Sequence, residues 1–201
     1  MSSISSFKRV VKILILGDTG VGKTSLVTRV VKGIFPDPDR LKSTIGSAFF
    51  VKDYKFDVMD ISAQIWDFAG QERFRSFMRN MFRGAEGGMF VFDLTNKVTL
   101  DDLESFWIPE IEEKLKINLE EGIFNDKTFI LVGNKKDKED LRDVTNEEIA
   151  KFAEKYNLPY YETSAKTGEN AEEVFFELVS KIYQKILQKI EERIRERQQA
   201  T

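Results

Sequence analysis

The 201-residue chain contains no cysteine and no histidine. The absence of cysteine excludes disulfides, thiolate metal sites, cysteine nucleophiles and every lipid attached through a thioether or thioester. The absence of histidine removes the usual general base and the commonest metal ligand. Any chemistry must therefore use carboxylates, amides, hydroxyls, lysines and main-chain groups.

Long apolar runs and a large excess of one charge are also missing. The longest apolar runs, such as residues 13–16, are far shorter than a membrane span, and residues 1–9 contain no hydrophobic signal core. The 31 basic and 34 acidic side chains give a net charge of -3, which offers no general attraction to nucleic acid. We therefore expect a cytoplasmic protein that binds no nucleic acid and recognises its partners through local features.

The apolar pattern predicts a single α/β domain. With 41% apolar and 12% aromatic residues, the chain can bury one substantial core. Strands are predicted over 10–16, 49–58, 61–66, 89–94, 128–132 and 160–163, and helices over 25–31, 100–116, 146–156 and about 171–197. Thr145 and Glu148 predict a capping box at the start of the third helix. Strands that alternate with helices indicate a mostly parallel sheet covered on both faces.

A glycine loop between the first strand and the first helix carries the strongest chemical signal. Residues 17–24 read Gly-Asp-Thr-Gly-Val-Gly-Lys-Thr and fit the pattern G-x-x-x-x-G-K-[ST]. Such a loop aims main-chain N–H groups and the positive end of a helix at one anion. Lys23 adds a full positive charge, and Thr24 offers its hydroxyl to Mg²⁺. The residues expected to bind the nucleotide here are Asp18, Thr19, Gly20, Val21, Gly22, Lys23, Thr24 and Ser25.

The phosphate loop alone suits kinases, ATPases and GTPases alike, so the base must be recognised elsewhere. Asn134, Lys135 and Asp137 follow the strand 128–132 and project from the edge of the sheet where ligands bind. A carboxylate such as Asp137 accepts two hydrogen bonds from one edge of guanine, whereas adenine has no matching pair of donors there. Lys135 can cover the purine plane, and Asn134 can bond the guanine edge and brace the phosphate loop. Their position after a strand gives weight to a tetrapeptide that is otherwise common in surface turns.

A second polar segment, after the strand predicted to end at Trp66, supplies candidates for metal binding and hydrolysis. Asp67 is placed to face the metal, and Gly70 to offer a main-chain N–H to the terminal phosphate. Gln71 is a poor base, so its expected role is to position the attacking water. Thr44 is the candidate second hydroxyl on Mg²⁺. The predicted catalytic residues are thus Lys23, Gly70 and Gln71, and the predicted metal ligands are Thr24, Thr44 and Asp67.

These motifs occur in the order found in the Ras superfamily of small GTPases, which the chain resembles over residues 8–181. They are the phosphate loop, Thr44, Asp67 with Gly70 and Gln71, Asn134 with Lys135 and Asp137, and Thr-Ser-Ala-Lys at 163–166. Residues 43–46, 64–74 and 162–166 most resemble the Rab branch. The resemblance implies a P-loop NTPase fold: a doubly wound, mostly parallel six-stranded sheet with one antiparallel edge strand and helices on both faces. It also implies bound GTP or GDP with Mg²⁺.

The resemblance adds roles for further residues around the base. Ala165 is implied to give its main-chain N–H to the guanine oxygen, with Ser164 and Lys166 beside it in the same motif. Phe35 is implied to pack against the base or the ribose.

The resemblance also implies that the protein is a switch. Segments 35–46 and 67–83 would be held by the terminal phosphate through Thr44 and Gly70, and released after hydrolysis. Effector, exchange-factor and activating proteins would bind these segments, in membrane trafficking or signalling.

Some residues depart from the Rab pattern. Phe68 stands where Rab-like sequences usually carry a small polar residue, and Met81 where they usually carry an aromatic one. Residues 36–42 make the loop before Thr44 slightly longer than usual. The choice of effector therefore cannot be carried over from the family.

The sequence divides into three expected segments. We expect an N-terminal tail over 1–7, a GTPase domain over 8–181 and a helical extension over 182–201. The chain ends without the terminal cysteines on which Rab proteins are prenylated. Ser2 stands in place of the glycine needed for myristoylation, so no lipid anchor motif is expected. Isoleucines recur on one face of the extension at 182, 186, 190 and 194. Three interpretations remain open: a solvated helix with pairs such as Glu191 and Arg195, a helix that lies peripherally on a membrane, or a partner-binding coil.

Two other classes of function remain open beside a GTPase switch. One is a P-loop kinase or ATPase that reads adenine, and the other is a scaffold that holds nucleotide without cycling. The presence of both Thr44 and Gln71 favours the switch. Intrinsic turnover should be slow, on the order of 10⁻⁴ to 10⁻² per second, because no arginine finger is clearly supplied in cis. Arg40, in the lengthened loop, is the one local candidate for that role.

Overall fold

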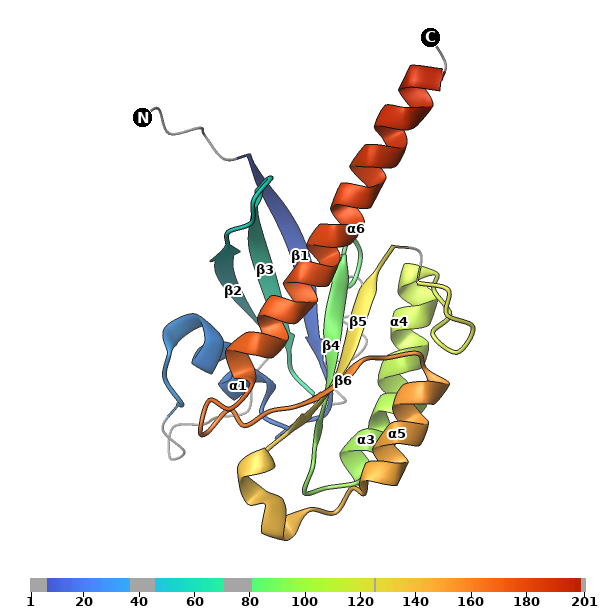
Figure 1. The fold of residues 1–201 in the computed structure, drawn as a ribbon. Coiled ribbons are helices and arrows are strands. Elements are labelled where there is room, and N and C mark those ends of the chain that lie inside the picture. Colours follow the sequence, from blue (N-terminus) through green and yellow to red (C-terminus); the bar gives the residue numbers. More distant parts are fainter. Residues whose placement is uncertain (1–6, 37–45, 71–80, 125, 200–201) are drawn as a thin grey trace.

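The structure, a computed structural model, describes residues 7–36, 46–70, 81–124 and 126–199. Six strands form one sheet (Figure 1): β1 Lys8–Leu16, β2 Ser47–Tyr54, β3 Asp60–Phe68, β4 Gly87–Asp93, β5 Thr128–Asn134 and β6 Tyr160–Glu162. Their order is β2-β3-β1-β4-β5-β6. β2 runs antiparallel to β3, and all other neighbours are parallel. The predicted mostly parallel sheet with one antiparallel edge strand is therefore confirmed.

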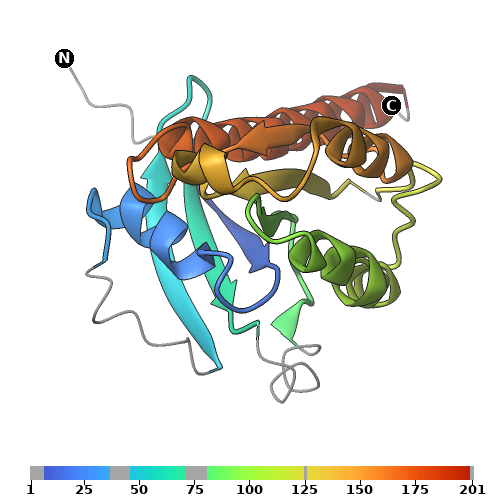
Figure 2. The ribbon, with the colours of Figure 1, turned by 90° about the horizontal axis from the view of Figure 1, so that it is seen from below.

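Helices cover both faces of the sheet, as predicted (Figure 2). They are α1 Lys23–Lys32, α3 Val98–Asp102, the π-helical segment η3 Leu103–Trp107, α4 Ile108–Leu115, the 3₁₀ segment η4 Lys136–Leu141, α5 Asn146–Lys155 and α6 Ala171–Gln199. Buried side chains of α1 and α6 join one core cluster, and those of η3, α4 and α5 join the other. No helix in the described ranges combines the length and the apolarity needed to cross a membrane.

The central strands are buried because both of their faces are covered. Every residue of β4 and β5 is buried, as expected for parallel strands between two helical layers. Alternate residues of β1 point to opposite layers, so Ile13 and Ile15 join the α1/α6 cluster while Leu14 and Leu16 join the other. This packing fixes the carboxyl ends of the parallel strands at a common edge, where the loops that carry the predicted motifs begin.

The structure corrects three predicted boundaries. β3 does not end at Trp66 but continues to Phe68, because Asp67 pairs with Ile15 of β1 and Phe68 with Ser47 of β2. β2 ends at Tyr54 rather than at 58, where the chain turns back toward β3. The helix predicted over 100–116 is interrupted by the π-helical segment and ends at Leu115.

The residue that departs from the Rab pattern at position 68 is part of the core. Phe68 is fully buried, and its ring meets the ring of Phe82 edge-on at 5.3 Å between centroids. An aromatic side chain here fills the layer beneath η3 and α4 rather than facing the end of the strand. The substitution is therefore a packing feature next to Asp67.

The predicted capping box at the start of α5 is confirmed. The Thr145 Oγ1 atom accepts a hydrogen bond from the Glu148 main-chain N–H at 3.2 Å. The Glu148 carboxylate accepts one in return from the Thr145 main-chain N–H at 2.9 Å. Both bonds satisfy donors that the first turn of a helix otherwise leaves unpaired.

Candidate functional site

A cavity of about 220 Å³ lies at the carboxyl ends of the strands, where four separate segments meet. Its lining residues are Gly20, Gly22, Ser25, Phe35, Asn134, Lys135, Asp137, Lys138, Ala165 and Lys166. All but Lys138 were predicted from the sequence to bind nucleotide. The fold thus brings the phosphate loop, Phe35 and both predicted base-recognition segments to one place.

The phosphate loop forms the turn from β1 into α1. Gly22 precedes α1 with a left-handed backbone (φ 95°), and no side chain of the described residues caps the helix start. Main-chain N–H groups at this end of α1 therefore face the loop without a capping oxygen, which suits an anion. Lys23 folds back across the loop, and its Nζ atom donates to the main-chain oxygens of Gly17 at 2.8 Å and Asp18 at 2.7 Å.

The burial of Lys23 makes the loop a strong site for negative charge. Only 5% of its surface is exposed, and this burial lowers the pKa of its ammonium group to about 8, against the opposing effects of Asp67 and Asp18. A buried ammonium gains more from a nearby anion than an exposed one because little water screens the pair. The phosphate groups of a nucleotide would supply that anion.

Asp67 supplies a buried carboxylate beside the phosphate loop. The Thr24 hydroxyl donates to its Oδ2 atom, while Oδ1 has no hydrogen-bond partner among the described residues. Burial raises the pKa of Asp67, and Lys23 and Thr24 oppose that shift. An incompletely bonded carboxylate next to a hydroxyl is the oxygen donor set that Mg²⁺ prefers. The described residues contain no group of three or more acidic side chains for a metal, so Thr24 and Asp67 are the side-chain donors that this part of the chain offers. Mg²⁺ usually keeps water and phosphate oxygens among its other ligands.

Asn134 joins the phosphate loop to the segment after β6. Its side chain is buried, with Nδ2 donating to the Val21 main-chain oxygen at 2.8 Å. Its Oδ1 atom accepts from the main-chain N–H of Ala165 and from the hydroxyl of Thr163, each at 3.2 Å. The brace that the sequence predicted between Asn134 and the phosphate loop is therefore present.

The side chains of Asp137 and Lys135 are held by neighbours that orient them. Asp137 Oδ1 accepts a hydrogen bond from the Ser164 hydroxyl at 2.6 Å. Lys135 Nζ pairs with the Asp93 Oδ2 atom at 2.5 Å. Sequence reasoning missed Asp93, although it ends the buried strand β4 and so follows the same rule, a polar residue at a strand's carboxyl end, that identified Asn134.

Arg29, in the last turn of α1, is a second residue that sequence reasoning missed. Its guanidinium donates from Nε to the Ala165 oxygen at 3.0 Å, from Nη2 to the Lys166 oxygen at 2.6 Å and from Nη1 to the Gly33 oxygen at 3.1 Å. A basic residue at this position normally indicates no more than a favourable interaction with the helix dipole. No sequence signal points to contacts 136 residues away.

The residues predicted for hydrolysis lie only partly within the described ranges. Gly70 is buried so closely against the phosphate loop that a Cβ there would come within 2.1 Å of the Thr19 main-chain nitrogen. Thr44, Gln71 and Arg40 lie outside the described residues. The segment that begins at Met81 is held against β1, because the Lys12 ammonium donates hydrogen bonds to the main-chain oxygens of Met81 and Arg83.

Comparisons with known proteins agree with this geometry. The family model described as "Ras family" matches residues 12–184. The chain is 40% identical over 171 residues to Ras-related protein Rab-8B of Homo sapiens, covering 85% of this chain and 77% of that protein. It is 37% identical over 171 residues to Ras-related protein YPTC6 of Chlamydomonas reinhardtii, with 85% and 74% covered. It is 38% identical over 171 residues to Ras-related protein Rab5 of Nicotiana tabacum, with 85% and 80% covered.

Proposed function

The chain belongs to the Ras family of small GTPases, which hydrolyse GTP to GDP, and we propose that the cavity at the carboxyl edge of its sheet is the guanine-nucleotide site. One observation carries this proposal. Residues of the phosphate loop, of the segment after β5 and of the segment after β6 line one cavity, and Asn134 hydrogen-bonds both the loop and the segment after β6. Phosphate and base would therefore be held by parts of one connected network.

On the phosphate side, Lys23 and the main-chain N–H groups of residues 18–25 would bind the nucleotide phosphates. Thr24, Thr44 and Asp67 would hold Mg²⁺, which neutralises charge on the phosphates when bound. Gly70 would offer its main-chain N–H to the terminal phosphate, and Gln71 would orient the attacking water. The open Oδ1 atom of buried Asp67 supports the metal assignment.

On the base side, Asp137 would accept the two N–H groups of the guanine edge. Ala165 would donate its main-chain N–H, which Asn134 Oδ1 accepts at 3.2 Å in this structure, to the guanine oxygen once the nucleotide is bound, with Ser164 and Lys166 completing the loop. Lys135 and Phe35 would cover the purine and ribose. The hydrogen bond from Ser164 to Asp137 supports this assignment, because it fixes the orientation of a carboxylate that lines the cavity.

As a switch, the protein would present different surfaces over residues 35–46 and 67–83 in its two nucleotide states. Effector, exchange-factor and activating proteins would bind there. Relatives named Rab support a role in membrane trafficking. We propose that a GTPase domain over 8–181 follows a tail over 1–7, that the protein works in the cytoplasm, and that the extension over 182–201 contacts a membrane peripherally.

Nucleotide competition followed by single-turnover hydrolysis tests the proposal. GTP and GDP should displace bound fluorescent GDP, and ATP should not. Purified protein loaded with GTP and Mg²⁺ should hydrolyse it once, on the order of 10⁻⁴ to 10⁻² per second, and Gln71→Leu should slow this step. Displacement by ATP as effective as by GTP would replace the guanine assignment with an adenine-reading enzyme. Wild-type protein that binds GTP without hydrolysing it would indicate a scaffold.

A further inference from the structure

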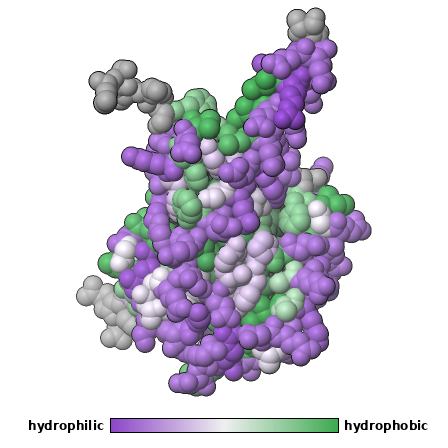
Figure 3. Space-filling view, in the orientation of Figure 1, coloured by the Kyte–Doolittle hydropathy of each residue, from purple (hydrophilic) through white to green (hydrophobic). Residues whose placement is uncertain are grey.

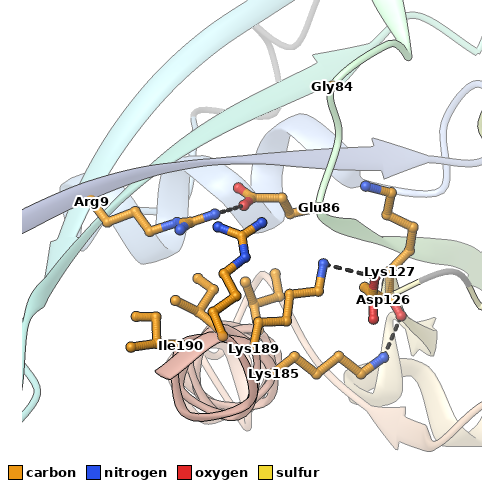
Figure 4. Close-up of a pocket in the computed structure, with 11 residues that line it drawn as sticks. Arg9, Gly84, Glu86, Asp126, Lys127, Lys185, Lys189 and Ile190 are labelled. Carbon is orange, nitrogen blue, oxygen red and sulfur yellow. Dashed lines mark hydrogen bonds and ion pairs between the residues drawn. The ribbon is translucent and has the colours of Figure 1, made fainter. Parts of the chain in front are cut away.

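A basic groove of about 440 Å³ lies at the end of the sheet opposite to the nucleotide cavity (Figure 1). Figure 4 shows its labelled side chains converging from the start of β1, the lead-in to β4, the turn before β5 and one face of α6. Buried isoleucines of α6, Ile182 and Ile186, line its floor together with the partly exposed Ile190. None of these residues takes part in the proposed nucleotide site, so the groove is a separate feature of the surface.

Positive charge dominates this groove. Five basic side chains line it, namely Arg9, Lys127, Lys185, Lys189 and Arg193, against the two carboxylates of Glu86 and Asp126. Glu86 pairs with Arg9 at 2.9 Å, and Asp126 pairs with Lys189 at 2.7 Å. Within the described part of the chain, Lys127, Lys185 and Arg193 form no ion pair with a carboxylate. The groove therefore keeps an excess of positive charge after its internal pairs are formed.

Lys185 is the most constrained of these cations. It is half-buried, and its ammonium donates to the Lys127 main-chain oxygen at 2.5 Å. Burial lowers the pKa of Lys185; Asp126 opposes the shift, and the neighbouring ammonium groups of Lys189 and Lys181 add to it. A partly desolvated cation among like charges gains strongly from an anion that enters the groove.

The helix beyond the groove carries two parallel stripes. Basic residues recur at every fourth position, at 181, 185, 189, 193 and 197, and isoleucines occupy the adjacent positions 182, 186, 190 and 194. The last turns of α6 project past the sheet in Figure 1, and Figure 3 shows hydrophobic surface along them beside the hydrophilic side chains. Ile190 and Ile194 are 37% and 49% exposed. Cations beside exposed aliphatic side chains are the composition of helices that lie on anionic membranes.

We propose that this groove binds the phosphorylated headgroup of an anionic membrane lipid, with the exposed isoleucines of α6 resting in the interfacial layer. The proposal rests on the membrane contact proposed above and names the site and the lipid class that would produce it. A headgroup with more than one phosphate suits the several cations of this groove better than a headgroup with a single negative charge does. The nucleotide cavity opens at the opposite end of the sheet, so it would stay accessible on a membrane.

Other occupants fit these observations less well. A second copy packed antiparallel on the isoleucine stripe would bring another row of cations beside this one, and like charges in contact destabilise such a pair. An acidic peptide would satisfy the charges but would leave Ile194, beyond the groove, without a partner. A membrane satisfies the charges and the exposed aliphatic side chains together.

Flotation of the full chain with lipid vesicles tests the proposal. Three vesicle types are needed: phosphatidylcholine alone, phosphatidylcholine with phosphatidylserine, and phosphatidylcholine with phosphatidylinositol bisphosphate, the last two matched in surface charge. The protein should float with anionic vesicles, most strongly with the bisphosphate, and soluble inositol trisphosphate should release it. Lys127→Gln combined with Arg193→Gln should weaken binding about 10- to 30-fold, because both residues line the groove without a carboxylate partner in the described structure.

The matched control removes the same charge elsewhere. Lys151→Gln with Arg195→Gln changes two exposed basic residues outside the groove and should reduce binding less than threefold. GDP affinity should be unchanged in both double variants, which shows that they fold. Equal weakening by the two pairs would overturn the groove while leaving a general membrane contact in place. A wild type that floats with no vesicle would overturn both the groove and the membrane contact. A wild type that floats equally well with neutral vesicles would overturn the anionic headgroup site and leave the membrane contact in place.

Discussion

The guanidinium of Arg29 in α1 donates a hydrogen bond to the main-chain oxygen of Ala165, 3.0 Å away, in the loop after β6. The same side chain binds the next carbonyl, that of Lys166, at 2.6 Å. Ala165 turns its own N–H toward Asn134, which in turn holds the phosphate loop. Arg29 therefore holds in place the loop whose Ala165 N–H we propose binds the guanine oxygen.

Replacing Arg29 by alanine should loosen the contact with the guanine oxygen. Loss of charge-assisted hydrogen bonds of this kind costs roughly 1–3 kcal/mol, so GDP should dissociate about 5- to 100-fold faster. The ratio of dissociation rates between 6-thio-GDP, a weaker acceptor at that position, and GDP should fall toward one. Stopped-flow release of fluorescent analogues measures both. Lys32→Ala, one turn along the same helix, is the control, and an unchanged 6-thio ratio in Arg29→Ala would contradict the positioning role.

Exchanging Asp137 for asparagine should change the preferred base. The asparagine amide donates where the carboxylate accepts, which suits the 2-oxo group of xanthine and opposes the 2-amino group of guanine. Sites built around such a pair discriminate strongly, so the ratio of xanthosine to guanosine diphosphate affinity should rise at least about a hundredfold. Ser164→Ala, which removes the donor to Asp137, should weaken GDP only about fivefold without changing preference. Competition binding measures the affinities for the two nucleotides. A guanine preference that persists in Asp137→Asn would place base recognition elsewhere.

Most of the motifs that the sequence predicted lie directly after a strand. The phosphate loop follows β1, and Asn134 is the last residue of β5. Local pattern sufficed there because the fold of alternating strands and helices brings strand ends to a common edge. The interrupted helix over 98–115 and the continuation of β3 through Asp67 were not predictable in this way. Asp is uncommon in strands, and its pairing here depends on β1 and β2 on either side.

The contacts that the sequence could not predict are those between distant segments. Arg29 reaches a loop 136 residues later, and the basic groove combines Arg9, Lys127 and α6. No periodicity or spacing records such contacts, because they depend on how the helices pack against the sheet. Phe68 illustrates the same point, since its role as a core residue beside Phe82 follows from packing and not from the motif that contains it.

The capping box at α5 predicts a stability change with a defined pH dependence. Thr145→Ala should destabilise the protein by about 1 kcal/mol, seen as a lower melting temperature. The ion pair with Lys97 and the bonds from Thr145 lower the pKa of Glu148 from 4.5 to about 2. Because the pKa of Glu148 is depressed in the folded state, the stabilisation that its carboxylate supplies is present above pH 4.5 and is lost as the pH falls through about 2.

Glu148→Gln should therefore melt at a lower temperature than the wild type at pH 7, and this difference should shrink as the pH falls from 4.5 through about 2. Glu147→Gln, in the same first turn but outside the capping box, is the control. Thermal melts followed by circular dichroism across this pH range supply the measurement. A melting difference for Glu148→Gln that persists undiminished at pH 2 would show that the carboxylate acts by packing and not by its charge.

Substitution of Gly70 by alanine should separate the phosphate loop from the segment that follows β3. The added Cβ would meet the Thr19 main-chain nitrogen at 2.1 Å and the Asp18 main-chain carbon at 2.3 Å, and main-chain atoms cannot rotate away as a side chain can. If the Gly70 N–H meets the terminal phosphate as proposed, hydrolysis should fall about 100- to 1,000-fold, the usual effect of losing one such donor. Affinity for a GTP analogue should fall more than affinity for GDP, which serves as the internal control. Single-turnover hydrolysis and competition binding measure these effects, and a Gly70→Ala protein that hydrolyses GTP at the wild-type rate would remove Gly70 from the catalytic site.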